Sequence, residues 1–165
     1  MMPGTPPDKD HPGSSPGETA HFRGLESLYG SAAINRLFES NLCIAEAGQA
    51  RIDAHLGETH FHAAGAVHGS GYFKLLDDAA FYAANSLVPD RFLLTTGFNL
   101  FFTKPLKPGP VVAEGRWVSG RKRIYVAEAR LLNADGEEVG RGTGTFMRSH
   151  IALSSLDGYR AGSGG

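Results

Sequence analysis

The sequence has little cysteine and little net charge. Cys43 is the single cysteine among 165 residues, so no intramolecular disulfide bond can form. A chain without disulfide bonds fits a reducing setting, and we expect a cytoplasmic protein. The formal net charge at pH 7 is only −1. A protein that neutralises many phosphate groups would carry a clear excess of basic residues, so nucleic acid is not an expected partner.

The sequence also lacks a long hydrophobic run. No apolar stretch approaches the roughly 20 residues needed to cross a bilayer, so no membrane partner is expected. Residues 1–20 contain five prolines and almost no large apolar side chain, which predicts a disordered tail rather than a signal peptide. The hydrophobic content of 41% is sufficient for one core. We expect one folded domain over residues 21–152 and a flexible C-terminal tail over residues 153–165.

The segment 60–88 contains the most informative pattern. Ser70 lies between two glycines and is a residue type that caps helices, so a helix is expected to begin near it. Six residues then recur at helical spacing and share one side of that helix: Phe73, Asp77, Ala80, Phe81, Ala84 and Val88. Five of the six are apolar, and Asp77 is the exception.

A carboxylate on the apolar side of a helix is costly unless it is hydrogen-bonded, paired or kept neutral. Asp77 is therefore either a functional group or a structural one that caps nearby backbone N–H groups, and the pattern alone leaves both readings open. Asp78 falls on another side, four residues after Lys74, where an exposed carboxylate can pair weakly with the lysine.

The start of this helix is a possible site for a negative charge. The N–H groups of Gly69, Ser70 and Gly71 are expected to point out of its positive end, an arrangement that binds anions or a developing oxyanion. Three histidines, His60, His62 and His68, precede this helix start and are expected close to it. Their spacings of two and six residues match no strong zinc motif, so we expect no metal site and interpret the histidines as hydrogen-bonding residues that shape the loop.

The rest of the chain predicts strands. Alternating or β-branched runs occupy residues 49–56, 91–105, 111–120, 123–133 and 137–149. In the second run, Thr95 and Asn99 are expected on one face. Gly140, Gly142 and Gly144 fall on one face of the last run and would let the slim, alanine-rich helix approach closely. The order of elements predicts an α+β protein in which five antiparallel strands curl around one long helix.

Two segments resemble a known family. They are HAAGAVHGSGYFKLLDDAAFYAANS, residues 62–86, and TTGFNLFFTKPLKPG, residues 95–109. The first is similar to the signature of PaaI-type hotdog-fold acyl-CoA thioesterases, in which HGG is followed by an aspartate eight residues after the first glycine. The resemblance continues through the closing strands over about 130 residues. It implies the hotdog fold, a five-stranded antiparallel sheet wrapped around a long central helix.

The resemblance also implies roles for individual residues. Asp77 stands at the position of the catalytic carboxylate, and Gly69 supplies an oxyanion-hole N–H. His62 occupies the position where many relatives carry an asparagine that helps to hold the thioester carbonyl. Thr95 falls where some relatives have a serine near the attacking water. Ser70 replaces the second glycine of HGG.

The expected reaction is the hydrolysis of an acyl-CoA to a carboxylic acid and CoA, with Asp77 as general base or as nucleophile. No cofactor is implied, since CoA is part of the substrate. Relatives form homodimers or dimers of dimers with active sites between subunits, and we expect the same here.

The candidate substrate-binding residues are Ser70, His68, Phe73, Phe81, Asn99, Arg121, Lys122 and Arg123. The last three form the densest basic segment of the chain and are a candidate site for the CoA phosphates.

Two other functions are compatible with the sequence. A hotdog hydratase or dehydratase acting on acyl thioesters would use a histidine base such as His62 rather than Asp77. A non-catalytic acyl-CoA-binding sensor would follow if Asp77 is only structural.

Overall fold

The computed structural model describes residues 14–160, so the outer parts of both expected tails lie outside the described residues. The helices are α1 (Pro16–Ser31) and α2 (Gly69–Asn85), with short 3₁₀ turns η1 (Ala33–Leu37), η2 (Glu58–His60) and η3 (Leu153–Ser155). The strands are β1 (Glu39–Cys43), β2 (Gln49–Leu56), β3 (Arg91–Phe102), β4 (Gly109–Ser119), β5 (Ile124–Leu132) and β6 (Glu138–Ala152).

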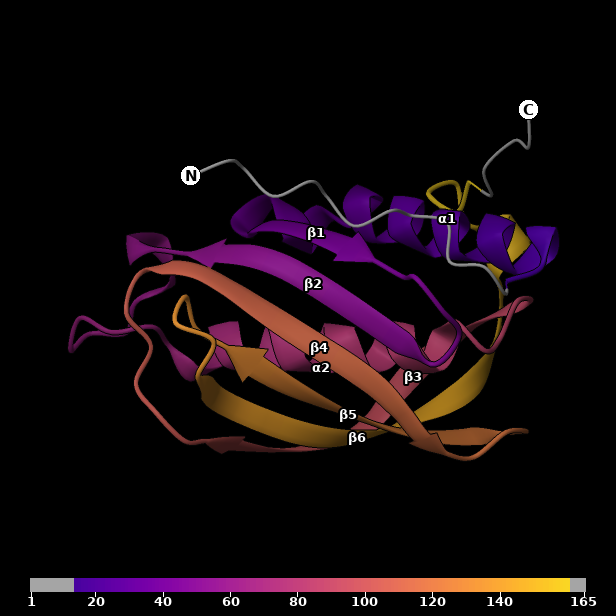
Figure 1. Ribbon diagram of the computed structural model, residues 1–165. Helices are drawn as coiled ribbons and strands as arrows, with labels where there is room; N and C mark the ends of the chain where they lie inside the picture. The colour runs from indigo at the N-terminus through magenta and orange to yellow at the C-terminus, as the bar shows by residue number, and fades with distance from the viewer. Residues whose placement is uncertain (1–13, 161–165) are drawn as a thin grey trace.

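The strands form one antiparallel sheet in the order β1-β2-β4-β5-β6-β3. The sheet curls around α2, which packs against β2, β3, β4, β5 and β6, while α1 lies beside β1 (Figure 1). This arrangement confirms the predicted α+β hotdog fold. The prediction of five strands was one too few.

The missed strand is β1, with the sequence ESNLC. Of its side chains only Leu42 is buried, so the segment has no apolar alternation that could have revealed a strand. It is held in the sheet by backbone pairing with residues 51–55 of β2.

The sheet approaches α2 most closely at Gly115 on β4. A Cβ at this position would lie 1.9 Å from the carbonyl oxygen of Ala79, so only glycine fits. Two of the three glycines on β6 that were predicted to make this contact have another role. A Cβ at Gly142 or Gly144 would lie 2.3 or 2.6 Å from the ring of Phe98, so these glycines accommodate an aromatic side chain of the neighbouring strand β3.

Both predicted tail boundaries need correction. Ser15 caps α1 together with Glu18, so the helix begins at Pro16 and residues 16–20 are not part of a tail. At the other end, Leu153 is fully buried and Tyr159 contacts Nδ1 of His21 through its hydroxyl, at 2.8 Å. Residues 153–160 therefore pack onto the domain instead of forming a flexible tail.

The part of the chain described here contains no helix that is long and apolar enough to span a membrane. Residues 14–160 also contain no group of three or more His, Cys, Asp or Glu side chains placed to hold a metal ion.

Candidate active site

The N-terminus of α2 is capped by His68, one residue before the helix begins. His68 Nδ1 accepts a hydrogen bond of 2.9 Å from the Ser70 N–H, and its carbonyl accepts one of 2.9 Å from the Gly71 N–H. The prediction that Ser70 is the cap was therefore wrong, and two of the three N–H groups expected to bind an anion are already used. Of these three N–H groups, only that of Gly69 has no acceptor among residues 14–160. This leaves it free to hold an oxyanion.

Asp77 lies two turns further along α2 and faces β3. Its Oδ1 accepts a hydrogen bond of 3.0 Å from the hydroxyl of Thr95. Burial raises the pKa of Asp77 to about 6, against the smaller lowering effect of the Thr95 hydrogen bond. The carboxylate is mostly ionised at neutral pH yet basic enough to take a proton, which is the condition for a general base.

A β-bulge brings Thr95 to this position. Thr95 pairs with Phe146 and Gly97 pairs with Thr145, so Thr96 is an extra residue in β3. The bulge reverses the side-chain alternation of the strand. Thr95 faces α2 before it, and Phe98 faces α2 after it, where its ring meets Phe73.

The bulge overturns the prediction that Asn99 shares a face with Thr95. Asn99 is exposed and pairs with Thr143, on the side of the sheet away from α2. A substrate-binding role for Asn99 beside Asp77 is therefore not supported. The glycine at position 97, within a run of β-branched and aromatic residues, was the one sequence signal that could have indicated a bulge.

Aromatic side chains flank the carboxylate. Phe73 lies one turn before Asp77 and is 40% exposed, and its ring packs edge-on against Phe98 with centroids 5.5 Å apart. Phe102 was not predicted as a site residue, but its ring lies against Gly69, 3.0 Å from where a Cβ would be. Phe81, in contrast, is buried among other aromatic rings of the core, so its placement does not support the predicted contact with substrate.

The loop histidines have separate roles. His62 is exposed, and its Nδ1 accepts a hydrogen bond of 3.0 Å from the Ala64 N–H. Its Nε2 is thereby left to donate, but within the described subunit His62 makes no hydrogen bond to Asp77. His60 stacks on Phe38 and accepts a hydrogen bond from the Gly57 N–H, so it joins the loop to the segment before β1.

Asp78 is not the exposed carboxylate that the sequence suggested. It pairs with Lys74, whose side chain is only 11% exposed and lies over the rings of Tyr29 and Phe38. Burial raises the pKa of Asp78, and the lysine partly offsets this. The pair is therefore a covered structural ion pair, on a different side of α2 from Asp77.

The predicted phosphate-binding residues lie at the turn between β4 and β5. Arg121, Lys122 and Arg123 are exposed, and within residues 14–160 none of them is close enough to a carboxylate to form an ion pair. Arg121 stacks over the ring of Trp117 at 5.3 Å. Lys104, between β3 and β4, is in contrast paired with Glu137.

The register of the sheet places this turn near Asp77. Met147 of β6 pairs with Leu94 on one side and with Ile124 on the other. Two strand spacings, about 10 Å, therefore separate the start of β5 from the strand position next to Thr95. A ligand with an extended arm can reach from one to the other.

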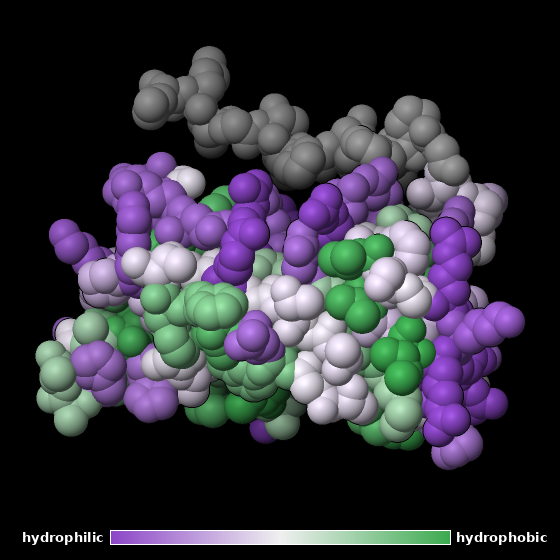
Figure 2. Space-filling model, turned by 90° about the horizontal axis from the view of Figure 1, so that it is seen from below, coloured by the Kyte–Doolittle hydropathy of each residue, from purple (hydrophilic) through white to green (hydrophobic). Residues whose placement is uncertain are grey.

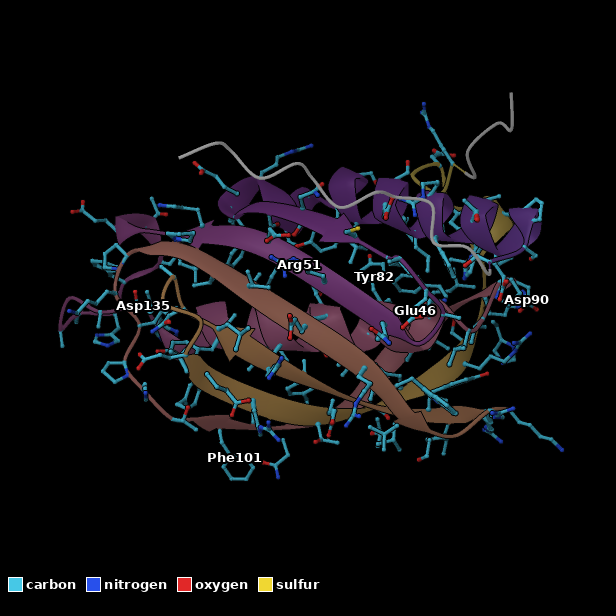
Figure 3. All side chains as sticks on the ribbon, viewed as in Figure 1. Glu46, Arg51, Tyr82, Asp90, Phe101 and Asp135 are labelled. Atoms are coloured by element: carbon cyan, nitrogen blue, oxygen red, sulfur yellow. The ribbon has the colours of Figure 1, made fainter. Side chains whose placement is uncertain are left out.

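A cavity of about 680 Å³ lies on the outer face of the sheet, away from Asp77. Its lining includes charged side chains that pair across strands, among them Arg51, Glu114 and Arg130. Arg51 lies on β2 (Figure 3). These charged side chains form ion pairs with one another, and none of the predicted site residues lines the cavity.

The comparisons with known proteins agree with this fold. The family model described as the thioesterase superfamily matches residues 64–140, which include Gly69, Asp77 and Thr95. A protein of Saccharolobus solfataricus named as an esterase is 28% identical over 102 residues, covering 62% of this chain and 68% of that protein.

Solved structures are similar over most of the chain. The E. coli PaaI protein from the phenylacetic acid degradation operon matches with a TM-score of 0.75 at 19% identity, covering 84% of this chain and 99% of that chain. A single-residue variant of PaaI from Thermus thermophilus matches with a TM-score of 0.65 at 21% identity, covering 72% of this chain and 100% of that chain. At these identities the structures establish the fold.

A long helix enclosed by a curled antiparallel sheet, with a carboxylate on the helix facing the edge strand, defines a hotdog protein with a candidate hydrolytic site. The family match adds the chemistry. Residues 64–140 match the thioesterase superfamily and the chain has the fold of the PaaI structures; together with the esterase-named relative, these matches support a thioester hydrolase.

Proposed function

We propose that the protein hydrolyses acyl-CoA thioesters and that Asp77 is the general base. The observation that carries this proposal is the contact between Asp77 and Thr95, since a half-buried carboxylate whose pKa is raised to about 6 is held by a single hydroxyl group. The second carboxylate oxygen remains available to accept a proton from water. Among residues 14–160, no other side chain on α2 combines these properties.

The proposed reaction begins when Asp77 removes a proton from water and the water oxygen attacks the thioester carbon. The carbonyl oxygen becomes an oxyanion, which the Gly69 N–H at the positive end of α2 stabilises. The tetrahedral intermediate then collapses, the C–S bond breaks, and the proton held by Asp77 passes to the leaving CoA sulfur. The alternative in which Asp77 attacks the carbon directly forms an anhydride. Label found in Asp77 after a single turnover in ¹⁸O-labelled water would establish the anhydride route, because only attack of water on the Asp77 carbon of an anhydride can place it there.

Gly69 and Asp77 of one subunit cannot act on the same carbonyl group. They are eight residues apart on α2, and a rise of about 1.5 Å per residue separates them by about 12 Å along the helix axis. An oxyanion donor must lie within about 3 Å of the oxygen that it stabilises. A complete site therefore requires a second copy of the chain, whose Gly69 approaches the first copy's Asp77.

The surface near β3 suits such a second copy. β3 is an edge strand of 12 residues, and four side chains on it or facing it are exposed and apolar: Phe73, Leu94, Phe101 and Phe102. Phe101 points away from the sheet (Figure 3). Seen from the side of β3 and β6, apolar and neutral residues cover much of the middle and lower part of the molecule, and hydrophilic residues gather along its upper and right margins (Figure 2). Pairing between two copies would cover this surface and the free strand edge.

Arg121, Lys122 and Arg123 are the residues that we propose to hold the phosphate groups of CoA. They are exposed cations without carboxylate partners among the described residues, and the sheet places their turn within reach of Asp77. Each charge-assisted contact with a phosphate stabilises a complex by roughly 1.5–3 kcal/mol.

The deciding experiment is a thiol-release assay on a panel of aliphatic and aromatic acyl-CoAs with wild-type protein and Asp77→Asn. We expect thiol release by the wild type that the substitution abolishes. Loss of enoyl-CoA absorbance without thiol release would instead identify a hydratase. Tight binding of acyl-CoA without turnover would identify a sensor, and either result would overturn the proposal.

A further inference from the structure

The hydrogen bond between Thr95 and Asp77 depends on the bulge in β3. In a strand with regular alternation, a threonine at 95 and a phenylalanine at 98 point to opposite faces. Here both face α2, because Thr96 is inserted between the paired positions. Without the bulge, either the hydroxyl group or the aromatic ring would be lost from the site.

Within one subunit, little else fixes the conformation of this bulge. β3 is at the edge of the sheet, so it has only β6 as a neighbouring strand. A bulged residue also loses its regular ladder pairing. The segment that positions Thr95 therefore has fewer backbone constraints than an interior strand.

A pair of hydroxyl groups occupies the bulge. The Thr96 hydroxyl lies 3.0 Å from the Thr145 hydroxyl and donates a hydrogen bond of 3.1 Å to the Thr145 carbonyl. Gly97 leaves room for this contact, since a Cβ there would lie 3.3 Å from the Thr145 hydroxyl oxygen. Three consecutive residues thus have different roles. Thr95 is hydrogen-bonded to Asp77, Thr96 is hydrogen-bonded to Thr145 of β6, and Gly97 leaves room for the second of these contacts.

We propose that Thr96 and Thr145 are positioning residues, which fix the bulge of β3 and thereby hold the Thr95 hydroxyl against Asp77. This inference deepens the proposed function and rests on Asp77 as the base. Neither residue touches the carboxylate, so both act through Thr95. When the pair is removed, the Thr95 hydroxyl loses its fixed direction, and Asp77 loses a donor that favours its ionised form.

The test uses four variants and one control variant. Thr96→Val keeps the shape of the side chain and removes the hydroxyl, and Thr96→Ser restores it. Thr95→Val removes the donor itself, and the double variant Thr95→Val/Thr96→Val completes a double-mutant cycle. Thr143→Val, an exposed threonine of β6 that does not contact the bulge, is the matched control.

Two readouts separate this inference from the proposed function. The first is a ¹³C NMR titration of the Asp77 carboxyl, which needs no catalysis. The pKa of Asp77 should rise in Thr96→Val and in Thr95→Val, and it should be unchanged in Thr96→Ser and Thr143→Val. An unchanged pKa in Thr96→Val would overturn the inference whether or not the enzyme is active.

The second readout is kinetic. We expect Thr96→Val to lower kcat about tenfold with little change in KM, less than the ~100-fold loss that a 1 Å displacement can cause. The double variant should be no slower than Thr95→Val, because Thr96 acts only through Thr95. Additive losses would show that Thr96 acts by another route and would overturn the inference. Full activity of Asp77→Asn would refute the proposed function, and the NMR titration would still decide the inference.

Discussion

The Thr95 hydroxyl on β3 donates a hydrogen bond of 3.0 Å to Asp77 on α2, across a sequence separation of 18 residues. The contact joins the central helix to the edge strand of the sheet. It identifies Asp77 as the carboxylate of the candidate site and Asp78, its neighbour in sequence, as part of a covered ion pair with Lys74. Substitution of Asp77 should therefore lower the rate of catalysis, whereas substitution of Asp78 should lower the stability of the fold.

Asp77→Asn should lower turnover by roughly 10² to 10⁴, because the amide cannot accept the proton of the attacking water. Steady-state thiol release measures the loss. Asp135→Asn, in the exposed turn between β5 and β6, is the control and should retain wild-type activity (Figure 3). Equal losses in the two variants would refute the assignment of Asp77.

The pH dependence of kcat/KM should follow the ionisation of Asp77. The general base is active when deprotonated, so kcat/KM should rise with pH through about 6 and level off above it. The Thr95 hydrogen bond lowers this pKa, so the midpoint in Thr95→Val should move to higher pH. A midpoint near the ordinary aspartate value in the wild type would contradict the assignment.

Asp77→Asn should also change stability in a pH-dependent way. Burial raises the pKa of Asp77 in the folded state above its unfolded value, so the folded state prefers the protonated form. The contribution to stability is present below the unfolded pKa and is lost as pH rises through about 6. Asp77→Asn has no such loss, so its Tm should exceed that of the wild type at pH 8 and approach it at pH 4. A Tm difference that does not depend on pH would show that the carboxylate is not desolvated.

Asp78→Asn should destabilise the fold, because it leaves the Lys74 ammonium covered without a carboxylate partner. Breaking a buried ion pair from one side costs roughly 3–5 kcal/mol. The partial exposure of Asp78, and the relief of the desolvation that raises its pKa, reduce the expected loss to about 1–3 kcal/mol. Urea denaturation measures it, and kcat per folded molecule should change little. A variant as stable as the wild type would show that the pair is not needed for the fold.

Arg121→Ala combined with Lys122→Ala should raise KM for acyl-CoA strongly and leave kcat nearly unchanged, because the lost contacts are far from the reacting bond. Activity on a short pantetheine thioester, which lacks the nucleotide, should be unaffected. Arg130→Ala with Arg141→Ala removes the same charge from the outer sheet face and is the control. Equal weakening of both substrates, or of neither, would place the phosphate site elsewhere.

The active form should be a homodimer or a dimer of dimers, since one subunit cannot bring Gly69 and Asp77 to the same carbonyl. Light scattering on dilute protein measures the assembly. Phe102→Asp places a charge on the exposed apolar surface beside β3 and should give inactive monomers, whereas Ile34→Asp, similarly exposed on η1, should leave the assembly intact. A wild-type protein that is active as a persistent monomer would refute the shared site.

The sequence by itself determined the architecture and predicted Asp77, Gly69 and Thr95 as candidate site residues. Helical spacing of apolar residues around Asp77 and four long strand patterns after it were sufficient for the architecture, because the period of a pattern is a local property of the chain. The signal was strongest where one face of an element is buried. It failed for β1, which has a single buried side chain and is held by backbone pairing that no residue pattern records.

Only the tertiary structure decided how the site residues meet. The inserted Thr96 reversed the alternation of β3, which brought Phe98 to the helix and took Asn99 away from it. Packing likewise gave the two adjacent aspartates different partners. Asp77 is hydrogen-bonded to the Thr95 hydroxyl of β3, and Asp78 pairs with Lys74. These outcomes depend on contacts between segments distant in sequence, so a shift of one residue in strand register would have changed them while leaving every local pattern the same.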